Sequence, residues 1–168
     1  DIGAYEVQVA SRTEVRDQTI LTPGNPNPTV TAPYEYGQPI SIDITTTEWA
    51  DELVGGILSA GPTRCEAAAR HGVPAIVAPG CLDMVNFGAP ETVPAKFKDR
   101  TFYQHNPQVT LMRTTPEECA ELGRLLAEKI NLSTGSVTVL LPTKAISVIS
   151  APGQKFHDPL ADRTDPGI

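Results

Sequence analysis

Polar side chains gather in the middle of this chain, between residues 82 and 115, in sequence that is otherwise apolar or typical of strands. A polar group in such surroundings costs free energy unless it is hydrogen-bonded. We therefore expect these side chains to meet a partner or a ligand. They are Asp83, Asn86, His105, Asn106, Gln108, Arg113, Thr114 and Thr115.

Asp83 and Asn86 follow the end of a predicted strand, and Gly88 would let the backbone approach a bound molecule closely. Asp83 could act as a general base, and Asn86 could hold a hydroxylated ligand. The alternative is a turn in which both side chains bond to their own backbone. The sequence leaves these two interpretations open.

His105 and Asn106 end a further predicted strand. A histidine can carry a proton near neutral pH, so His105 is a second candidate acid or base. The alternative is a structural role, which is the commoner one for a lone histidine. His157 and Asp158 form another histidine–acid pair, but no close spacing of ligands supports a metal site, and we expect none.

Arg113, Thr114 and Thr115 come directly before a strong helix start. A planar guanidinium suits a carboxylate or a phosphate, and the start of a helix adds amide donors for an anion. These residues are therefore candidates for binding a ligand. The alternative, which the sequence leaves equally open, is a buried arginine paired with Asp83 or Glu48.

Thr45, Thr46, Thr47 and Glu48 offer hydroxyl and amide groups where another helix is expected to begin. They could bind a ligand anion, or the threonines could cap the helix. The glycines at 55 and 56 fall inside the helical pattern, where we expect them to permit close packing. The sequence contains no glycine-rich phosphate loop of the familiar types.

Composition narrows the function classes. The formal net charge is −7 and no cluster of Lys or Arg appears, so direct binding to nucleic acid is not expected. The three cysteines are widely spaced, which favours small buried side chains over disulfides or zinc ligands. No apolar run is long enough to span a membrane, and the first residues do not resemble a signal peptide. We expect a cytoplasmic protein with no membrane contact.

From residue 39 onwards, predicted strands alternate with predicted helices. The strands are expected at 40–44, 73–78, 100–105 and 136–141, and the helices at 48–57, 63–71 and 116–132. This alternation predicts an α/β fold with a mainly parallel sheet. Ligands collect at the carboxyl ends of such strands. Segments 45–48, 79–88, 105–115 and 142–144 are predicted to leave that edge.

Residues 1–38 differ in character from the rest. Residues 5–10 alternate like a strand, and a connection rich in proline and asparagine follows. We interpret 1–38 as an irregular proline-rich arm with one or two short strands. The predicted organisation is this arm, an α/β domain over 39–160, and a tail over 161–168.

Four stretches, at residues 43–56, 82–88, 105–115 and 151–159, resemble the signatures of the Tm-one-like family, named for a tomato protein that blocks tobamovirus RNA replication. The resemblance covers about residues 40–160 and corresponds to the second of two α/β domains. It implies a Rossmann-like, three-layer domain in a dimer-forming protein. ATP binding is implied only through the family's other domain, so the cofactor of this chain is unknown.

The resemblance also leads us to expect an incomplete domain. The family has a further strand and helix before residue 43 and a closing helix after residue 159, which this sequence does not resemble. A sheet that lacks a strand exposes an edge, so we expect a homo-oligomer or a partner domain to complete it, or the N-terminal arm to substitute for the strand.

Three functions remain open from the sequence. The first is an α/β domain that binds a small anionic or nucleotide-like ligand. The second is an enzyme at the same site, with Asp83 or His105 as acid or base and Arg113 as the anion clamp. The third is a protein-interaction module related to an antiviral inhibitor.

Overall fold

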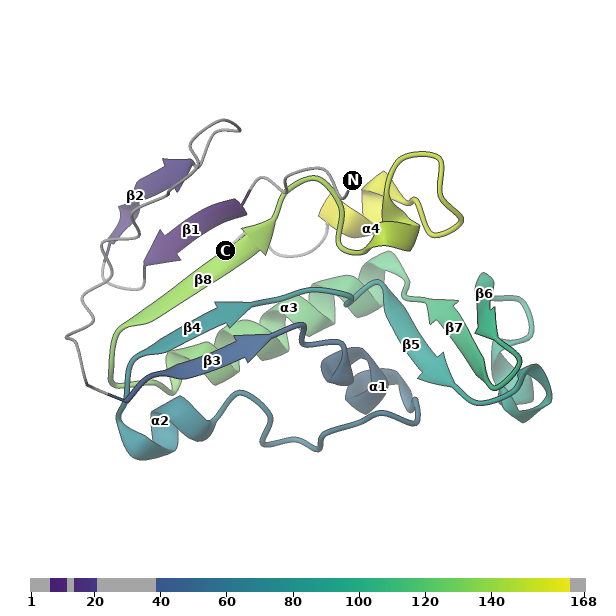
Figure 1. Ribbon diagram of the computed structural model, residues 1–168, viewed down its shortest axis with the longest axis horizontal. Coiled ribbons are helices and arrows are strands. Elements are labelled where there is room, and N and C mark those ends of the chain that lie inside the picture. Colours follow the sequence, from purple (N-terminus) through teal and green to yellow (C-terminus); the bar gives the residue numbers. More distant parts are fainter. Residues whose placement is uncertain (1–6, 12–13, 21–38, 164–168) are drawn as a thin grey trace.

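The computed structural model describes residues 7–11, 14–20 and 39–163 (Figure 1). It shows an α/β fold with one five-stranded sheet and a separate three-stranded sheet. The predicted fold class is confirmed. The predicted proline-rich connection and most of the predicted tail lie outside the described residues.

Three parallel strands form the centre of the larger sheet. β3 (Ser41–Ile44) pairs with β4 (Ala75–Ala78), which pairs with β8 (Val137–Pro142). β4 and β8 are short, mainly apolar runs, as strands in a buried parallel sheet require, whereas β3 alternates between polar and apolar residues. Their carboxyl ends point to one edge, where the candidate site residues were expected.

The described part of the N-terminal arm extends this sheet. β1 (Val7–Ser11) runs antiparallel to β8, close to the strand predicted at 5–10. β2 (Glu14–Ile20) pairs with β1, which gives the strand order β2-β1-β8-β4-β3. The arm therefore covers the β8 side of the parallel strands, and β3 forms the opposite edge.

Helix α3 (Pro116–Asn131) begins as the sequence predicts. The Thr115 hydroxyl accepts a hydrogen bond from the amide of Glu118 at 3.2 Å, and the Glu118 carboxylate accepts one from the amide of Thr115 at 2.8 Å. This capping box satisfies two backbone donors at the helix start. The remaining described helices are α1 (Glu48–Val54), α2 (Ala67–His71) and α4 (Pro159–Arg163).

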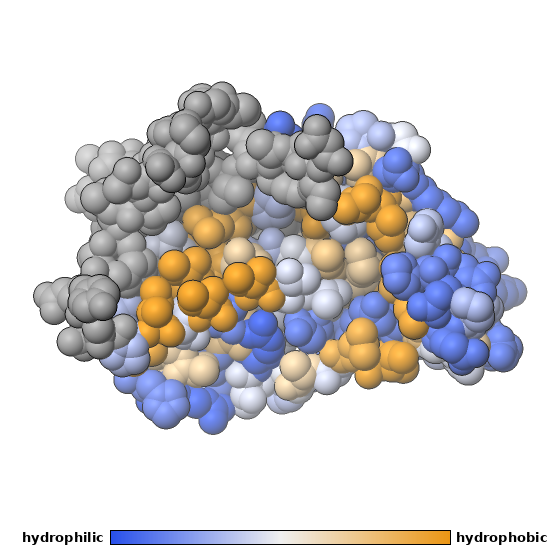
Figure 2. Space-filling view, viewed as in Figure 1, coloured by the Kyte–Doolittle hydropathy of each residue, from blue (hydrophilic) through white to orange (hydrophobic). Residues whose placement is uncertain are grey.

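Helices α1, α2 and α3 pack against one face of the parallel strands. Ala75, Val77, Val137 and Val139 point to that face and share a core with Trp49, Ala68, Leu122, Leu126 and Ile130. On the other face, Ile42 and Ile44 are 58% and 63% exposed. Figure 2 shows apolar surface gathered over this part of the sheet. Over Ile42 and Ile44, no described residue forms the third layer that the resemblance implies.

The smaller sheet corrects part of the prediction. Its strands are β5 (Met84–Phe87), β7 (Val109–Arg113) and β6 (Phe102–Asn106), in that order and all antiparallel. The strand predicted at 100–105 therefore does not join the parallel sheet. β6 and β7 are linked by a turn too short for the crossover that parallel strands need.

Two glycines end α1 instead of lying inside it. Gly55 adopts a left-handed conformation with φ 97°, and its amide donates to the carbonyl of Asp51 at 2.8 Å. A Cβ atom on Gly56 would lie 1.7 Å from the Oδ1 atom of Asp51. The prediction that the helix runs to residue 57 is wrong, because both positions require glycine for a turn and a close approach.

The helix predicted at 63–71 begins later, at Ala67, and ends at His71, where Gly72 stops it as expected. None of the helices in the described ranges has the length and apolar character to cross a membrane.

Candidate functional site

The segments that follow the three parallel strands lie side by side, as predicted. The amide of Thr45, after β3, donates to the carbonyl of Ala78 at 3.0 Å. The amide of Cys81, after β4, donates to the carbonyl of Ile146, which follows β8, at 3.0 Å. These contacts define the carboxyl edge of the sheet, and they place Asp83 and Thr46 within one continuous region.

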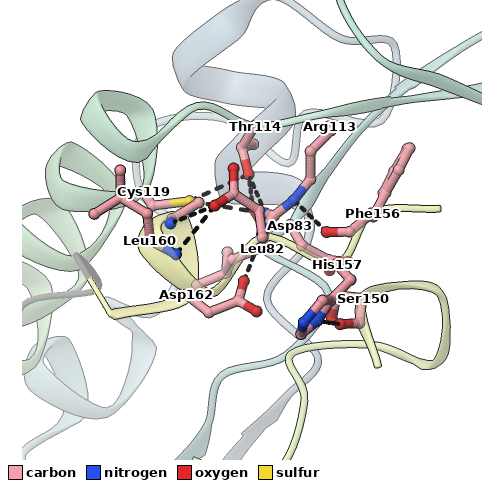
Figure 3. Close-up of polar contacts among 12 residues, drawn as sticks. Leu82, Asp83, Arg113, Thr114, Cys119, Ser150, Phe156, His157, Leu160 and Asp162 are labelled. Carbon is pink, nitrogen blue, oxygen red and sulfur yellow. Dashed lines mark hydrogen bonds and ion pairs between the residues drawn. The ribbon is translucent and has the colours of Figure 1, made fainter. Parts of the chain in front are cut away.

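Asp83 lies at the centre of a buried polar cluster at this edge (Figure 3). Its side chain is 1% exposed, and its Oδ2 atom accepts a hydrogen bond from the hydroxyl of Ser147 at 2.5 Å. Burial raises the pKa of Asp83, and the Ser147 hydrogen bond and the charge of Arg113 oppose that rise. The Oδ1 atom accepts no hydrogen bond from another described residue.

Arg113 uses its whole guanidinium fork inside the protein. Its Nε atom donates to the carbonyl of Phe156 at 2.9 Å, and its Nη1 atom donates to the hydroxyl of Thr114 at 3.1 Å. Its Nη2 atom forms an ion pair with Asp162 of α4. The side chain is 7% exposed. Arg113 therefore holds the C-terminal segment against β7 and has no free donor pair for a ligand.

Thr114 and Thr115 also serve the fold. The Thr114 hydroxyl donates to the carbonyl of Leu82 at 3.0 Å, and the Thr114 amide donates to the carbonyl of Asp83 at 3.2 Å. Thr115 caps α3. Together they fix the end of β7 against the start of β5.

The Asp83 cluster is closed to organic ligands. The cavity beside it is about 10 Å³, lined by Leu82, Asp83, Arg113, Ile146 and Asp162 among others. A volume of that size corresponds to about one water molecule. Ser147 and Asp162 were not predicted from the sequence, since neither lies in a recognisable pattern and both reach Asp83 and Arg113 only through the fold.

Asn86 pairs with an acid that the sequence analysis did not connect to it. Its side-chain amide donates to the Oδ2 atom of Asp51 at 2.7 Å, and its backbone amide donates to Oδ1 at 2.9 Å. Asp51 is 1% exposed, and burial raises its pKa while the hydrogen bonds from Asn86 lower it. This pair joins α1 to β5 and explains why Gly56 cannot carry a side chain.

Three other candidates lie away from the carboxyl edge. His105 is exposed on β6 and has no hydrogen bond or ion pair with another described residue. The Oδ1 atom of Asn106 accepts a hydrogen bond from the amide of Gln108 at 2.8 Å, so Asn106 shapes the β6–β7 turn. A Cβ atom on Gly88 would lie 2.9 Å from the hydroxyl of Thr92. The structure does not bring these residues to Asp83.

The segment of Thr45, Thr46, Thr47 and Glu48 differs from the Asp83 cluster, because several of its buried polar groups lack hydrogen-bond partners. Thr46 is fully buried, and the buried hydroxyls of Thr46 and Thr47 have no hydrogen-bond partner among the described residues. Neither hydroxyl caps α1, although the carbonyls of both residues accept bonds from α1 amides at 3.0 Å. Helix capping, the alternative interpretation, therefore does not account for them.

The backbone around these hydroxyls is in an unusual conformation. Thr45 has φ 55°, and Cys81, at the end of the neighbouring strand, has φ 56°. Residues with a side chain rarely adopt this left-handed region, and such residues concentrate at binding sites. Thr45 directly follows β3, and Cys81 lies three residues after β4. The backbone is therefore strained where the chain leaves these two strands.

The charges beside this segment are mainly negative. Arg64 forms an ion pair with Asp43, and its Nε atom lies 3.9 Å from the Oε2 atom of Glu48. That oxygen is buried and accepts no hydrogen bond from a described residue. Two acids around one arginine disfavour a bare anion here, whereas a ligand hydroxyl can donate to the free carboxylate oxygen.

The described residues contain no group of three or more His, Cys, Asp or Glu side chains placed to hold a metal ion.

The family model and the similar proteins that match this chain indicate the same family. Residues 39–164 match the C-terminal domain of an uncharacterised protein family, UPF0261. The chain is 54% identical over 116 residues to a UPF0261 protein of Clostridium tetani, and 50% identical over 121 residues to one of Rhizobium meliloti. It is 45% identical over 120 residues to the ToMV resistance protein Tm-1(GCR237) of Solanum lycopersicum.

These matches cover 69%, 72% and 71% of this chain, respectively. They cover only 29%, 30% and 16% of the three relatives, so the chain spans less than a third of the length of the proteins that it resembles.

Proposed function

The chain belongs to the UPF0261 family through its C-terminal domain, and we propose that it is a small-molecule-binding α/β domain. The ligand lies at the carboxyl ends of β3 and β4, against Thr46, Thr47 and Glu48. The observation that carries this proposal is the pair of buried threonine hydroxyls without partners. A buried hydroxyl without a partner costs free energy, and a bound ligand would recover it.

The ligand class follows from the groups on offer. Two hydroxyls can donate or accept, and the Oε2 atom of Glu48, which has no hydrogen-bond partner among the described residues, accepts only. The ion pairs of Arg64 leave no unpaired cation in this segment to clamp a phosphate. We therefore propose a nucleotide-like ligand whose ribose or other hydroxylated part contacts these residues, with any phosphate lying outside them. ATP belongs to this class, and the family resemblance makes it the first nucleotide to test.

Thermal shift with ribose, adenosine and ATP tests the proposal, because a ligand that binds the native state raises its apparent stability. We expect adenosine and ATP to raise the melting temperature in a saturable way. The variants Thr46→Val and Thr47→Val remove one hydroxyl each, and we expect each to abolish or strongly reduce the shift.

Thr63→Val is the matched control, because Thr63 is exposed in the loop before α2. It should leave the ligand-induced shift unchanged. If none of the three compounds stabilises the wild-type protein, or if Thr46→Val and Thr47→Val retain the full shift, the ligand does not lie against these hydroxyls.

An enzyme with Asp83 as the acid or base is the second candidate. It is favoured by the Oδ1 atom of Asp83, which is buried without a partner, and by the raised pKa of that carboxyl. Such an enzyme must open the cluster that joins Asp83 to Ser147. Turnover of a bound nucleotide that Asp83→Asn abolishes while binding persists would select this candidate over simple binding.

We also propose that β3 is an association surface for a second copy or for a partner domain. β3 is an edge strand of the larger sheet, and its residues Ile42 and Ile44 expose apolar surface. An exposed edge with apolar side chains favours pairing. Light scattering should give a mass above 17.9 kDa, the mass of one chain, that Ile42→Lys with Ile44→Lys reduces to the single chain.

A cytoplasmic location completes the proposal. Cys65, Cys81 and Cys119 are free thiols, and the reducing cytoplasm keeps such thiols unpaired. Fractionation of cells that express the full-length protein tests this location.

A further inference from the structure

A groove on the smaller sheet lies apart from the carboxyl edge. It has a volume of about 420 Å³ and opens between β6, β7 and the turns at Pro90–Thr92 and Ala95–Phe97. Val93, Pro94 and Phe102 contribute apolar walls. Cavities of this size hold small organic ligands. None of the candidate residues predicted from the sequence lines it.

Thr110 gives the groove a buried polar group. Its side chain is 4% exposed, and its hydroxyl has no hydrogen-bond partner among the described residues. In β7 it pairs with Phe87 of β5 and Gln104 of β6, so it faces the same side of the sheet as both. An unsatisfied hydroxyl among apolar walls is destabilising, and a hydroxyl on a bound molecule would satisfy it.

Two lysines stand at the opening of the groove. Lys98 and Lys155 are exposed and line it, and neither ammonium group forms a hydrogen bond or ion pair with another described residue. Other lysines are engaged: Lys129 pairs with Glu66, and Lys96 lies 4.6 Å from the centre of the Phe97 ring. Two unpaired cations at one groove are notable in a chain of net charge −7.

The apolar walls, the Thr110 hydroxyl and the two lysines together indicate which class of ligand the groove would bind. We propose that this groove binds a small organic carboxylate with an apolar ring and a polar group at the opposite end. The ring packs between Val93 and Phe102, the carboxylate meets Lys98 and Lys155, and the polar group reaches Thr110. This second site shares no residue with the nucleotide-like site proposed at β3 and β4.

Three related compounds test the assignment on the full chain. 4-Hydroxybenzoate carries the ring, the carboxylate and the hydroxyl, benzoate lacks the hydroxyl, and 4-hydroxybenzamide lacks the charge. Amide chemical shifts report where each binds. We expect saturable shifts in β6, in β7 and at residues 90–98, with 4-hydroxybenzoate binding at least about tenfold more tightly than the amide, because charge-assisted contacts to lysine are lost.

Variants separate the contributions of the two ends. Lys98→Gln and Lys155→Gln should each weaken 4-hydroxybenzoate, and the double variant should abolish its binding. Lys96→Gln, which removes a neighbouring charge outside the groove, is the matched control and should bind normally. Thr110→Val should remove the preference for 4-hydroxybenzoate over benzoate and leave benzoate binding intact.

Several results would overturn this assignment. They are equal binding of 4-hydroxybenzoate and 4-hydroxybenzamide, an absence of saturable shifts near the groove, and full binding by the double lysine variant. A peptide with a free carboxyl terminus that binds more tightly than all three compounds would reassign the groove to a protein partner. Thr46→Val should not change binding here, so the two proposed sites stand or fall independently.

Discussion

Two groups of polar side chains meet the carboxyl edge of the parallel sheet, and they differ in how their hydrogen bonds are satisfied. In the cluster around Asp83 and Arg113, the guanidinium, the threonine hydroxyls and one carboxylate oxygen each of Asp83 and Asp162 have protein partners. Beside it, the hydroxyls of Thr46 and Thr47 have none. The first group holds the fold together, whereas the two hydroxyls of the second are buried with unused hydrogen-bonding capacity.

A polar residue type alone does not identify a binding site. Arg113 has the chemistry of an anion clamp, but Asp162 and the carbonyl of Phe156 occupy its donors. Thr46 has the chemistry of a helix cap, but it caps nothing. What distinguishes a site is the residual hydrogen-bonding capacity after folding.

The largest expected effect is in the satisfied cluster. Arg113→Met should lower the free energy of unfolding by about 3–5 kcal/mol, because it leaves the buried Asp83 and the half-buried Asp162 without their counter-charge. Urea denaturation measures this loss. Arg124→Ala, which removes an exposed arginine from ion pairs on α3, should change stability little. Equal effects of the two variants would contradict a structural role for the cluster.

Asn86→Ala should have a smaller effect of the same sign. It removes the amide that donates to Asp51 and leaves a buried carboxylate oxygen without that partner, which costs about 2 kcal/mol. Gln108→Ala, at an exposed side chain in the β6–β7 turn, serves as the control. If Asn86→Ala unfolds at the same urea concentration as the control, the Asp51–Asn86 pair does not stabilise the junction of α1 and β5.

Two threonines, each next to the start of a helix, should respond with opposite signs. Thr115→Val removes the cap of α3 and should destabilise by about 1 kcal/mol. Thr46→Val removes an unsatisfied buried hydroxyl and should stabilise the protein without ligand by about 1 kcal/mol. Thermal unfolding without ligand compares them. Destabilisation by Thr46→Val would mean that its hydroxyl already has a partner and would remove the basis of the proposed site.

The smallest effect concerns pH. Burial raises the folded-state pKa of Asp83 above 3.8, so its folded form holds a proton more tightly than the unfolded chain. The resulting stabilisation is complete below about pH 3.8 and is lost as pH rises through the folded pKa. The stability of the wild type relative to Asp83→Asn should therefore increase as pH falls from 7 to 4.

Urea unfolding at both pH values measures that difference, and the contribution of Asp51, which both proteins share, cancels in it. Asp99→Asn, at an exposed acid before β6, is the control. A difference that shrinks towards pH 4 would show that the charged form of Asp83 is the one the fold favours.

Much of the fold could be predicted from local sequence. The capping box of α3 and the short apolar strands of the parallel sheet are visible in residue types and their spacing, because both depend on neighbours along the chain. The smaller sheet was not predicted. β5 and β7 are brief and contain polar residues such as Asn86 and Arg113, and their pairing joins segments distant in sequence.

The sequence predicted which segments meet at the carboxyl edge, but it did not predict the hydrogen-bond partners of their side chains. The sequence placed Asp83 and the Thr45 segment at one edge, because parallel strands end together. It also placed His105 there, although β6 belongs to the other sheet and His105 is exposed. Strand direction is a property of pairing, and one strand's sequence does not contain it.

The α/β class, the family and the residues that surround the strand ends can all be inferred from residue types and their order. Which of those residues keep hydrogen-bonding capacity depends on the folded arrangement. Ser147 and Asp162 reach Asp83 and Arg113 from segments far along the chain, whereas no described residue forms a hydrogen bond with the hydroxyls of Thr46 and Thr47. Whether a buried polar group is hydrogen-bonded depends on residues that are distant in the sequence, and only folding brings those residues close to it.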